Sequence, residues 1–180
     1  YAEQYSDARV KAIAAEIRLA DDNDHPIVNH NGFSTFANDP NLDSYAVQTT
    51  HDTPGGFHSA MVGEWNTAQG RYNITMAEGH PDAFGSVARL RSWATAMGGA
   101  YIVHLRWFKP ADPFTGAVSD EDLRMCGRVT RFFEDTKVNE MAPHDELRSG
   151  GTQYVLANPG QSYITYASSL SGDIGIRSMT

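Results

Sequence analysis

The sequence predicts an α/β fold in which helices cover a parallel sheet and a smaller antiparallel unit follows. Short apolar segments with the length of buried strands alternate with longer segments whose apolar residues recur at helical spacing. Strands that alternate with helices form parallel sheets, because each helix carries the chain back to the start of the next strand. With 41% hydrophobic residues among 180, the chain can bury a substantial core.

The helices are predicted from apolar stripes and from the signals at their ends. Ser6 is an N-cap candidate for the first helix, and Gly98 with Gly99 ends the second. Ser119 and Asp122 form a variant of the capping box ahead of the third. The predicted helices are residues 5–20, 81–97 and 121–134.

The strands are predicted from short apolar runs and from alternation. The strands of the parallel sheet are residues 27–30, 44–48, 59–63 and 100–105. Later in the chain, alternating residues on both sides of a Pro159-Gly160 turn predict a β-hairpin over residues 152–167. We therefore expect the helix-covered sheet in residues 1–145 and the start of a small β domain in residues 146–180.

Charge and cysteine content limit the classes of partner. The formal net charge is -8 with 14 Lys and Arg in total and no basic run, which argues against nucleic acid or an anionic membrane as the main partner. No segment has the length of a membrane span. One cysteine, Cys126, allows neither an internal disulfide nor a cysteine metal cluster. A neutral or weakly charged ligand is expected, with no cofactor.

The candidate site is built around Glu64, which directly follows the predicted strand 59–63. Carboxyl ends of parallel strands line the crevice where ligands bind, so Glu64 is predicted to face a polar and aromatic mouth. Glycoside hydrolysis needs two carboxyl groups, and aromatic faces nearby bind sugar rings. Asp52 is the comparable acid at a neighbouring strand end. The substrate-binding candidates are His30, Asn31, His51, Asp52, Trp65, Asn66, His104 and Trp107.

The order of several segments resembles apiosidase-like (β/α)8 glycoside hydrolases with a C-terminal β domain labelled collagen-binding. The segments that carry this similarity are residues 12–18, 25–30, 61–64, 89–100, 131–134, 141–145 and 154–157, so it covers nearly the whole chain. In such barrels the acid/base carboxylate follows the fourth strand, and the nucleophile is a Glu at the end of the seventh. The resemblance gives Glu64 the second role, and it favours an extracellular or periplasmic location.

The same resemblance implies that this chain corresponds to strands five to eight of a barrel plus the start of the β domain. The acid/base residue would then lie on the missing half, and an upstream segment, another chain or a second copy would complete the barrel, because open sheet edges must be covered. By itself the chain is expected to be inactive. One alternative is a non-catalytic structural or carbohydrate-binding assembly protein on a degenerate barrel. Another is a zinc-dependent hydrolase that uses His30, His51, Glu64 and His104.

Overall fold

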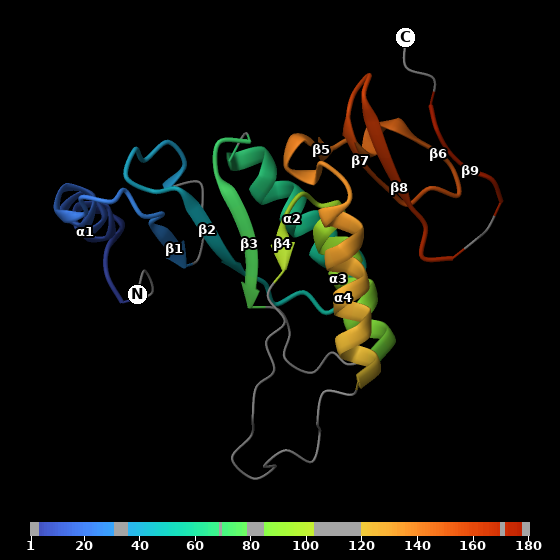
Figure 1. The fold of residues 1–180 in the computed structure, drawn as a ribbon, viewed down its shortest axis with the longest axis horizontal. Coiled ribbons are helices and arrows are strands. Elements are labelled where there is room, and N and C mark those ends of the chain that lie inside the picture. Colours follow the sequence, from blue (N-terminus) through green and yellow to red (C-terminus); the bar gives the residue numbers. More distant parts are fainter. Residues whose placement is uncertain are drawn as a thin grey trace.

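The structure is a computed structural model, and it describes residues 4–30, 36–68, 70–78, 85–102, 120–169 and 172–177 (Figure 1). The helices are α1 (Asp7–Ala20), α2 (Pro54–Ala68), α3 (Gly85–Met97) and α4 (Asp120–Glu134), with short 3-10 helices η2 (Val138–Glu140) and η3 (Asp145–Leu147). The strands are β1 (Val28–His30), β2 (Ser44–Gln48), β3 (Asn73–Glu78), β4 (Tyr101–Ile102), β5 (Ala142–Pro143), β6 (Arg148–Gly150), β7 (Tyr154–Asn158), β8 (Ser162–Tyr166) and β9 (Ile174–Ile176).

Strands β1 to β4 form one parallel sheet in the order β1-β2-β3-β4. One face of this sheet carries Tyr45, Val47, Ile74 and Met76, which are buried in a single hydrophobic cluster with Phe57 and Met61 of α2. The α/β class and the parallel sheet predicted from the alternation of elements are therefore confirmed.

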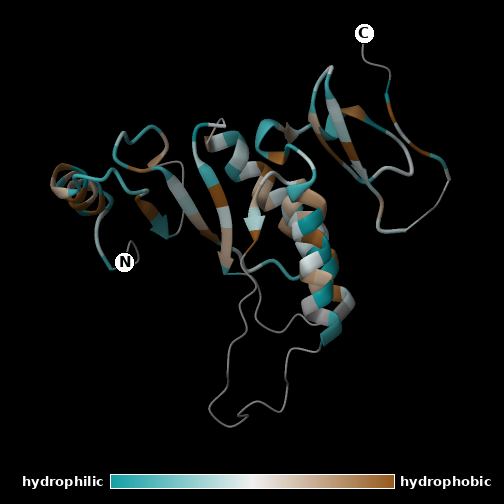
Figure 2. Cartoon of the chain, in the orientation of Figure 1, coloured by the Kyte–Doolittle hydropathy of each residue, from teal (hydrophilic) through white to brown (hydrophobic). Residues whose placement is uncertain are grey.

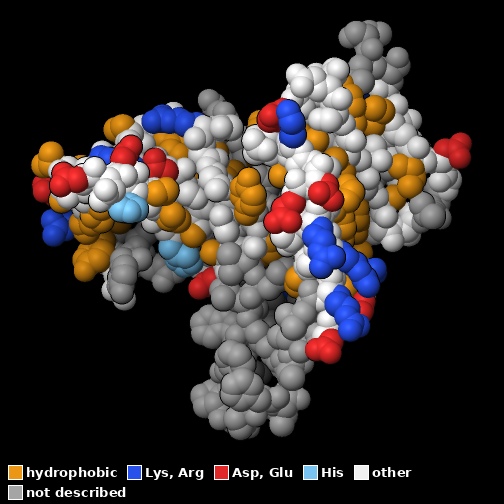
Figure 3. Space-filling view, viewed as in Figure 1, with side chains coloured by type: hydrophobic (Ala, Val, Ile, Leu, Met, Phe, Trp, Pro, Cys, Tyr) orange, Lys and Arg blue, Asp and Glu red, His pale blue; other side chains and the backbone are white. Residues whose placement is uncertain are grey.

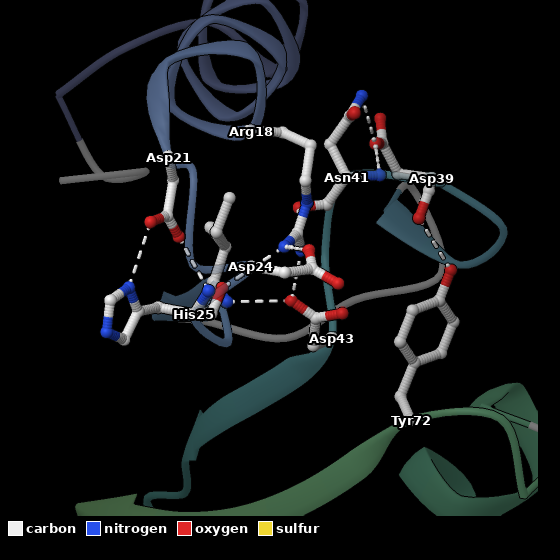
Figure 4. Close-up of polar contacts among 9 residues, drawn as sticks. Arg18, Asp21, Asp24, His25, Asp39, Asn41, Asp43 and Tyr72 are labelled. Atoms are coloured by element: carbon white, nitrogen blue, oxygen red, sulfur yellow. Dashed lines mark hydrogen bonds and ion pairs between the residues drawn. The ribbon is translucent and has the colours of Figure 1, made fainter.

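Helix α1 is held beside β1 and β2 by Arg18 (Figure 4). The Arg18 guanidinium forms ion pairs with Asp24 and Asp43. Asp43 also accepts a hydrogen bond of 2.7 Å from the amide of Ile27. The predicted cap is present, because the Ser6 hydroxyl accepts a hydrogen bond from the amide of Arg9. The contacts of Arg18 and Asp43 fix the turn between α1 and β1 at the amino end of the sheet.

The expected strand at residues 59–63 is wrong, because these residues lie inside helix α2. The hydroxyl of Thr53 accepts a hydrogen bond of 3.1 Å from the amide of Gly56 and caps the helix, and Pro54 occupies the first helical position. Phe57, Met61 and Ala68 are spaced for one helical face and are all buried.

The third strand of the sheet is instead β3, a segment for which the sequence analysis predicts no element. Its Ile74 and Met76 alternate with the less buried Asn73 and Thr75, as expected for a strand with two different faces. The other elements match their predictions more closely. Strand β2 has the predicted bounds, and β1 covers the last three residues of the segment expected at 27–30.

Helix α3 ends at the predicted glycines and crosses α2 closely. A Cβ added to Gly98 would lie 2.7 Å from the Cβ of Met61, and Gly99 has a φ of +83°, so both positions need glycine. Of the expected helix 81–97 and strand 100–105, residues 81–84 and 103–105 lie outside the described residues. Helix α4 begins one residue before its expected range of 121–134.

The predicted hairpin is present as β7 and β8, which pair antiparallel around a turn that includes Gly160. Strand β5 joins this hairpin, and β6 pairs with β9 in a separate two-stranded sheet. The hairpin packs on the helices through a second hydrophobic cluster of Ala94, Met97, Met141, Tyr154, Leu156 and Ile164. Hydrophobic and hydrophilic residues are interspersed along α4 (Figure 2). Arg124 and Arg128 of this helix are exposed, and charged side chains lie over it in the space-filling view (Figure 3).

A buried histidine joins the two parts of the chain. His58 of α2 contacts the carbonyl oxygen of Ala94 through Nδ1 at 3.1 Å and Asp145 Oδ2 through Nε2 at 2.7 Å, and its ring stacks on Tyr154. Burial alone would raise the pKa of Asp145, but hydrogen bonds from His58 and the Val155 amide hold that pKa below its usual range.

Candidate functional site

The candidate site lies at the carboxyl end of the parallel sheet, on the face that points away from the hydrophobic cluster. We call this the open face. Strand pairing places His30, Ala46, Thr75 and Tyr101 in one row across the sheet, with Gln48 and Glu78 in the next row of the same face. Val28 and Tyr101 on this face are 54% and 49% exposed, whereas Tyr45 on the opposite face is fully buried.

A β-bulge turns Glu78 onto the open face. Val47 pairs with Met76, but the next residue of β2, Gln48, pairs with Glu78, so Ala77 is an extra residue in β3. In an unbroken strand Glu78 would follow the alternation of Ile74 and Met76 and point into the hydrophobic cluster. The extra residue instead gives Glu78 the orientation of Gln48. Bulges of this kind are frequent beside active sites, where they aim a side chain.

His30 and Glu78 approach each other across β2. Nε2 of His30 lies 3.9 Å from Oε1 of Glu78, a distance longer than a hydrogen bond. Ala46 lies beside His30 in its row, one row before Glu78, and its small side chain does not block this approach. Nε2 of His30 is buried and has no hydrogen-bond partner among the described residues. An imidazole and a carboxylate therefore face one another on the open face, at a distance of 3.9 Å.

Glu64, Trp65 and Asn66 do not lie at this edge. Helix α2 begins after β2 and runs back toward the start of β3, so its last two turns lie at the amino end of the sheet. Trp65 marks the position, because a Cβ added to Gly99, just before β4, would lie 2.6 Å from Trp65 Cδ1. The expectation that a strand delivers Glu64 to the ligand crevice is wrong for this reason.

The surroundings of Glu64 are those of a carboxyl group on the packed side of a helix. Glu64 falls on the same helical stripe as Phe57, Met61 and Ala68, which are buried. Burial raises its pKa, and Oε2 is buried without a hydrogen-bond partner among the described residues. A perturbed carboxyl group can mark a functional site, but here it lies away from the strand carboxyl ends.

The remaining candidates divide into two groups. His51 and Asp52 are exposed in the loop after β2, at the same edge as His30 and Glu78. Asn31, His104 and Trp107 lie outside the described residues. Within the described ranges no group of three or more His, Cys, Asp or Glu side chains is placed to hold a metal ion. The zinc hypothesis also required Glu64, which lies at the other end of the sheet from His30 and His51. No helix in that part of the chain is long and apolar enough to cross a membrane.

Glu78 was missed because residues 59–63, which lie in α2, were predicted as the third strand in place of residues 73–78. Its local signal is present: residues 73–76 alternate polar and apolar, and Glu78 follows two positions later. Comparison with protein-family models, with curated proteins and with solved structures finds no match for this chain. The site is therefore interpreted from its own geometry.

Proposed function

We propose that the chain forms one half of a (β/α)8 barrel, corresponding to strands five to eight. The observation that carries this proposal is the strand order, which increases from β1 to β4 without reversal while all strands run parallel. A doubly wound sheet reverses its order at a switch point, with helices on both faces. Right-handed crossovers without reversal put the helices on one face and leave the other as the inner wall of a barrel.

The outer edge of the sheet supports an extension of both layers. β1 is an edge strand, and an open edge exposes unpaired backbone groups. Beside it, Ile17 and Leu19 of α1 are 46% and 83% exposed, and hydrophobic side chains gather at this end of the molecule (Figure 3). A further β/α unit, supplied by upstream sequence or by another chain, would pair with β1 and cover these side chains.

We further propose that the completed barrel is a glycoside hydrolase and that Glu78, rather than Glu64, is its nucleophile. Glu78 is the last residue of the third of the four parallel strands, which is the seventh in the proposed numbering. Its carboxylate would attack the anomeric carbon while a carboxylic acid on the other half donates its proton to the departing glycosidic oxygen. Water would then release the sugar, and the acid would recover its proton from that water. His30 is placed to hold the Glu78 carboxylate or a sugar hydroxyl.

The second candidate function is a structural or carbohydrate-binding assembly protein. The observation that favours it concerns the carboxyl groups of the open face. Among the described residues of its strands, Glu78 is the carboxylate on this face, and no second one lies beside it. A pair of carboxyl groups about 5 Å apart is needed for the retaining reaction. This candidate therefore predicts that the completing unit brings no acid close to Glu78.

The test is a substitution pair in the completed protein, produced with the sequence that precedes it or with its partner chain. Glu78→Gln should lower the turnover of aryl glycosides by at least 100-fold, because the nucleophile is lost. Glu64→Gln is the matched control and should keep turnover near that of the unsubstituted protein. Full activity of the Glu78→Gln variant would remove Glu78 from the mechanism. Binding of sugars without any turnover would favour the assembly protein.

A further inference from the structure

Arg91 of α3 is a buried cation that lacks an anionic partner in the described part of the chain. It is 8% exposed, and its Nε and Nη1 atoms are buried without a hydrogen-bond partner among the described residues. Its Nη2 donates to the main-chain carbonyl oxygen of Asp52, and its guanidinium lies 5.2 Å from the ring centroid of Phe57. A guanidinium stays charged at any physiological pH, and burying such a charge without compensation is costly. Two donor nitrogens of this group therefore have no acceptor among the described residues.

The guanidinium lies at the N-terminus of α2, because Asp52 directly precedes the capping residue Thr53. The start of a helix carries partial positive charge and unpaired amides. The first turn of α2 contains no acidic residue to balance that charge. The amide of Gly56 is already used by Thr53, and Pro54 has no N–H, so the amide of Gly55 is the donor that remains.

The residues around the helix start are exposed, whereas Nε and Nη1 of Arg91 lie buried beneath them. Residues 51–53 and Gly55 are exposed. His51 lies against the helix start, since a Cβ added to Gly56 would be 2.9 Å from the Cβ of His51. Asp52 is the opposing feature, because its exposed carboxylate would repel an anion. Arg91 binds the carbonyl of Asp52 and not the carboxylate, so its charge is not neutralised there.

From this juxtaposition we infer that the N-terminus of α2 and the buried Arg91 form a binding site for an oxyanion, namely a carboxylate or phosphate group of a ligand. The guanidinium offers two charge-assisted hydrogen bonds, and Gly55 offers a backbone amide. The net charge of the chain is -8, so general attraction of anions is not expected and binding would depend on the local donors of this turn. The site is independent of Glu78 and does not require the proposed hydrolase activity.

The experiment titrates this chain with inorganic phosphate, glucuronate and glucose at constant ionic strength. Binding is followed by the amide resonance of Gly55 and by the midpoint of thermal unfolding. Phosphate, glucuronate or both should shift the Gly55 resonance with saturation and raise the midpoint, whereas neutral glucose should do neither. Preference between the two anions identifies the source of the oxyanion, a phosphorylated or an acidic sugar-like ligand.

The variants separate Arg91 from general charge effects. Arg91→Lys keeps the charge but loses the planar donor set, and it should weaken anion binding at least 10-fold, as should Arg91→Met where that variant folds. Arg89→Met is the matched control, because Arg89 is an exposed arginine on the same helix, and it should leave binding unchanged. Asp52→Asn should strengthen binding, since it removes the repelling charge. Absence of saturable binding, equal binding of glucose, or unchanged binding in Arg91→Lys would overturn the inference.

Discussion

Removing the carboxylate of Asp145 should destabilise the contact between α2 and the β7–β8 hairpin. His58 is 5% exposed and Asp145 26% exposed, and the 2.7 Å contact joins residues that are 87 positions apart in sequence. Breaking a fully buried ion pair costs about 3–5 kcal/mol, and the partial exposure of Asp145 reduces this to roughly 2–3 kcal/mol for Asp145→Ala. For a chain of this size that corresponds to a decrease of about 4–12 °C in the unfolding midpoint.

Asp145→Asn separates the charge from the hydrogen bonds. Both ring nitrogens of His58 face acceptors in the native arrangement, namely the carbonyl oxygen of Ala94 and the carboxylate of Asp145. In the Asn variant the amide nitrogen can donate to Nε2 of a neutral ring, while the amide oxygen still accepts from Val155, and the expected cost is below about 1 kcal/mol. Denaturant titrations followed by circular dichroism at pH 7 measure both variants.

The pH dependence provides a second measurement of the same contact. The pKa of Asp145 is lower in the folded chain than its usual value, so Asp145 stabilises the fold above the usual pKa of an aspartate. This stabilisation is lost as the pH falls through the lowered pKa. Asp145→Asn should therefore make the acid side of the stability profile less steep. A loss below about 0.5 kcal/mol in Asp145→Ala, or equal losses in the two variants at pH 7, would refute the reasoning.

Two further predictions concern helix packing. Glu64→Gln should stabilise the chain by about 0.5–1 kcal/mol at pH 7, because burial raises the pKa of Glu64 and penalises its charged form. Denaturant titration should show this gain at pH 7 and no gain at pH 4. A gain at both pH values would contradict this cause. Gly98→Ala should cost about 1–3 kcal/mol, because the added Cβ meets Met61 at 2.7 Å. Gly127→Ala is its control in a helix: nothing lies within 4 Å, and thermal unfolding should show a small gain in stability.

Local signals were sufficient where one element could be read by itself. Ser6 and the Gly98-Gly99 pair fixed helix ends because capping depends on a few neighbouring residues. Strand β2 and the hairpin followed from apolar and alternating patterns between turn residues. The count of four parallel strands was also correct for the described residues, although one of the four was assigned to the wrong segment.

The error at residues 59–63 has a physical cause. Five small and apolar residues in a row fit a buried strand or one turn of a buried helix, and length alone does not separate them. The helix start at Thr53-Pro54 was the decisive signal, because Pro is favoured at the first helical position and Thr caps it. Because that segment was assigned as the third strand, β3 was not predicted, and Glu64 rather than Glu78 became the candidate carboxylate.

Other features depend on tertiary structure and have no local signal. The partnership of His58 with Asp145 connects distant parts of the chain. The exposure of Glu78 on the open face depends on how β3 pairs with β2, since the sequence pattern alone places Glu78 with Ile74 and Met76 on the buried face.

The extra residue in β3 makes the orientation of Glu78 depend on chain length rather than on side-chain chemistry. Removing Ala77 would restore a regular ladder and would turn the acid toward Phe57 and Met61, with every amino acid of the edge still present. An alanine scan would not detect this effect, because position 77 is already an alanine and substitution leaves the number of residues unchanged. Among related chains, a gain or loss of one residue at this position would distinguish those in which the acid lies on the open face from those in which it does not.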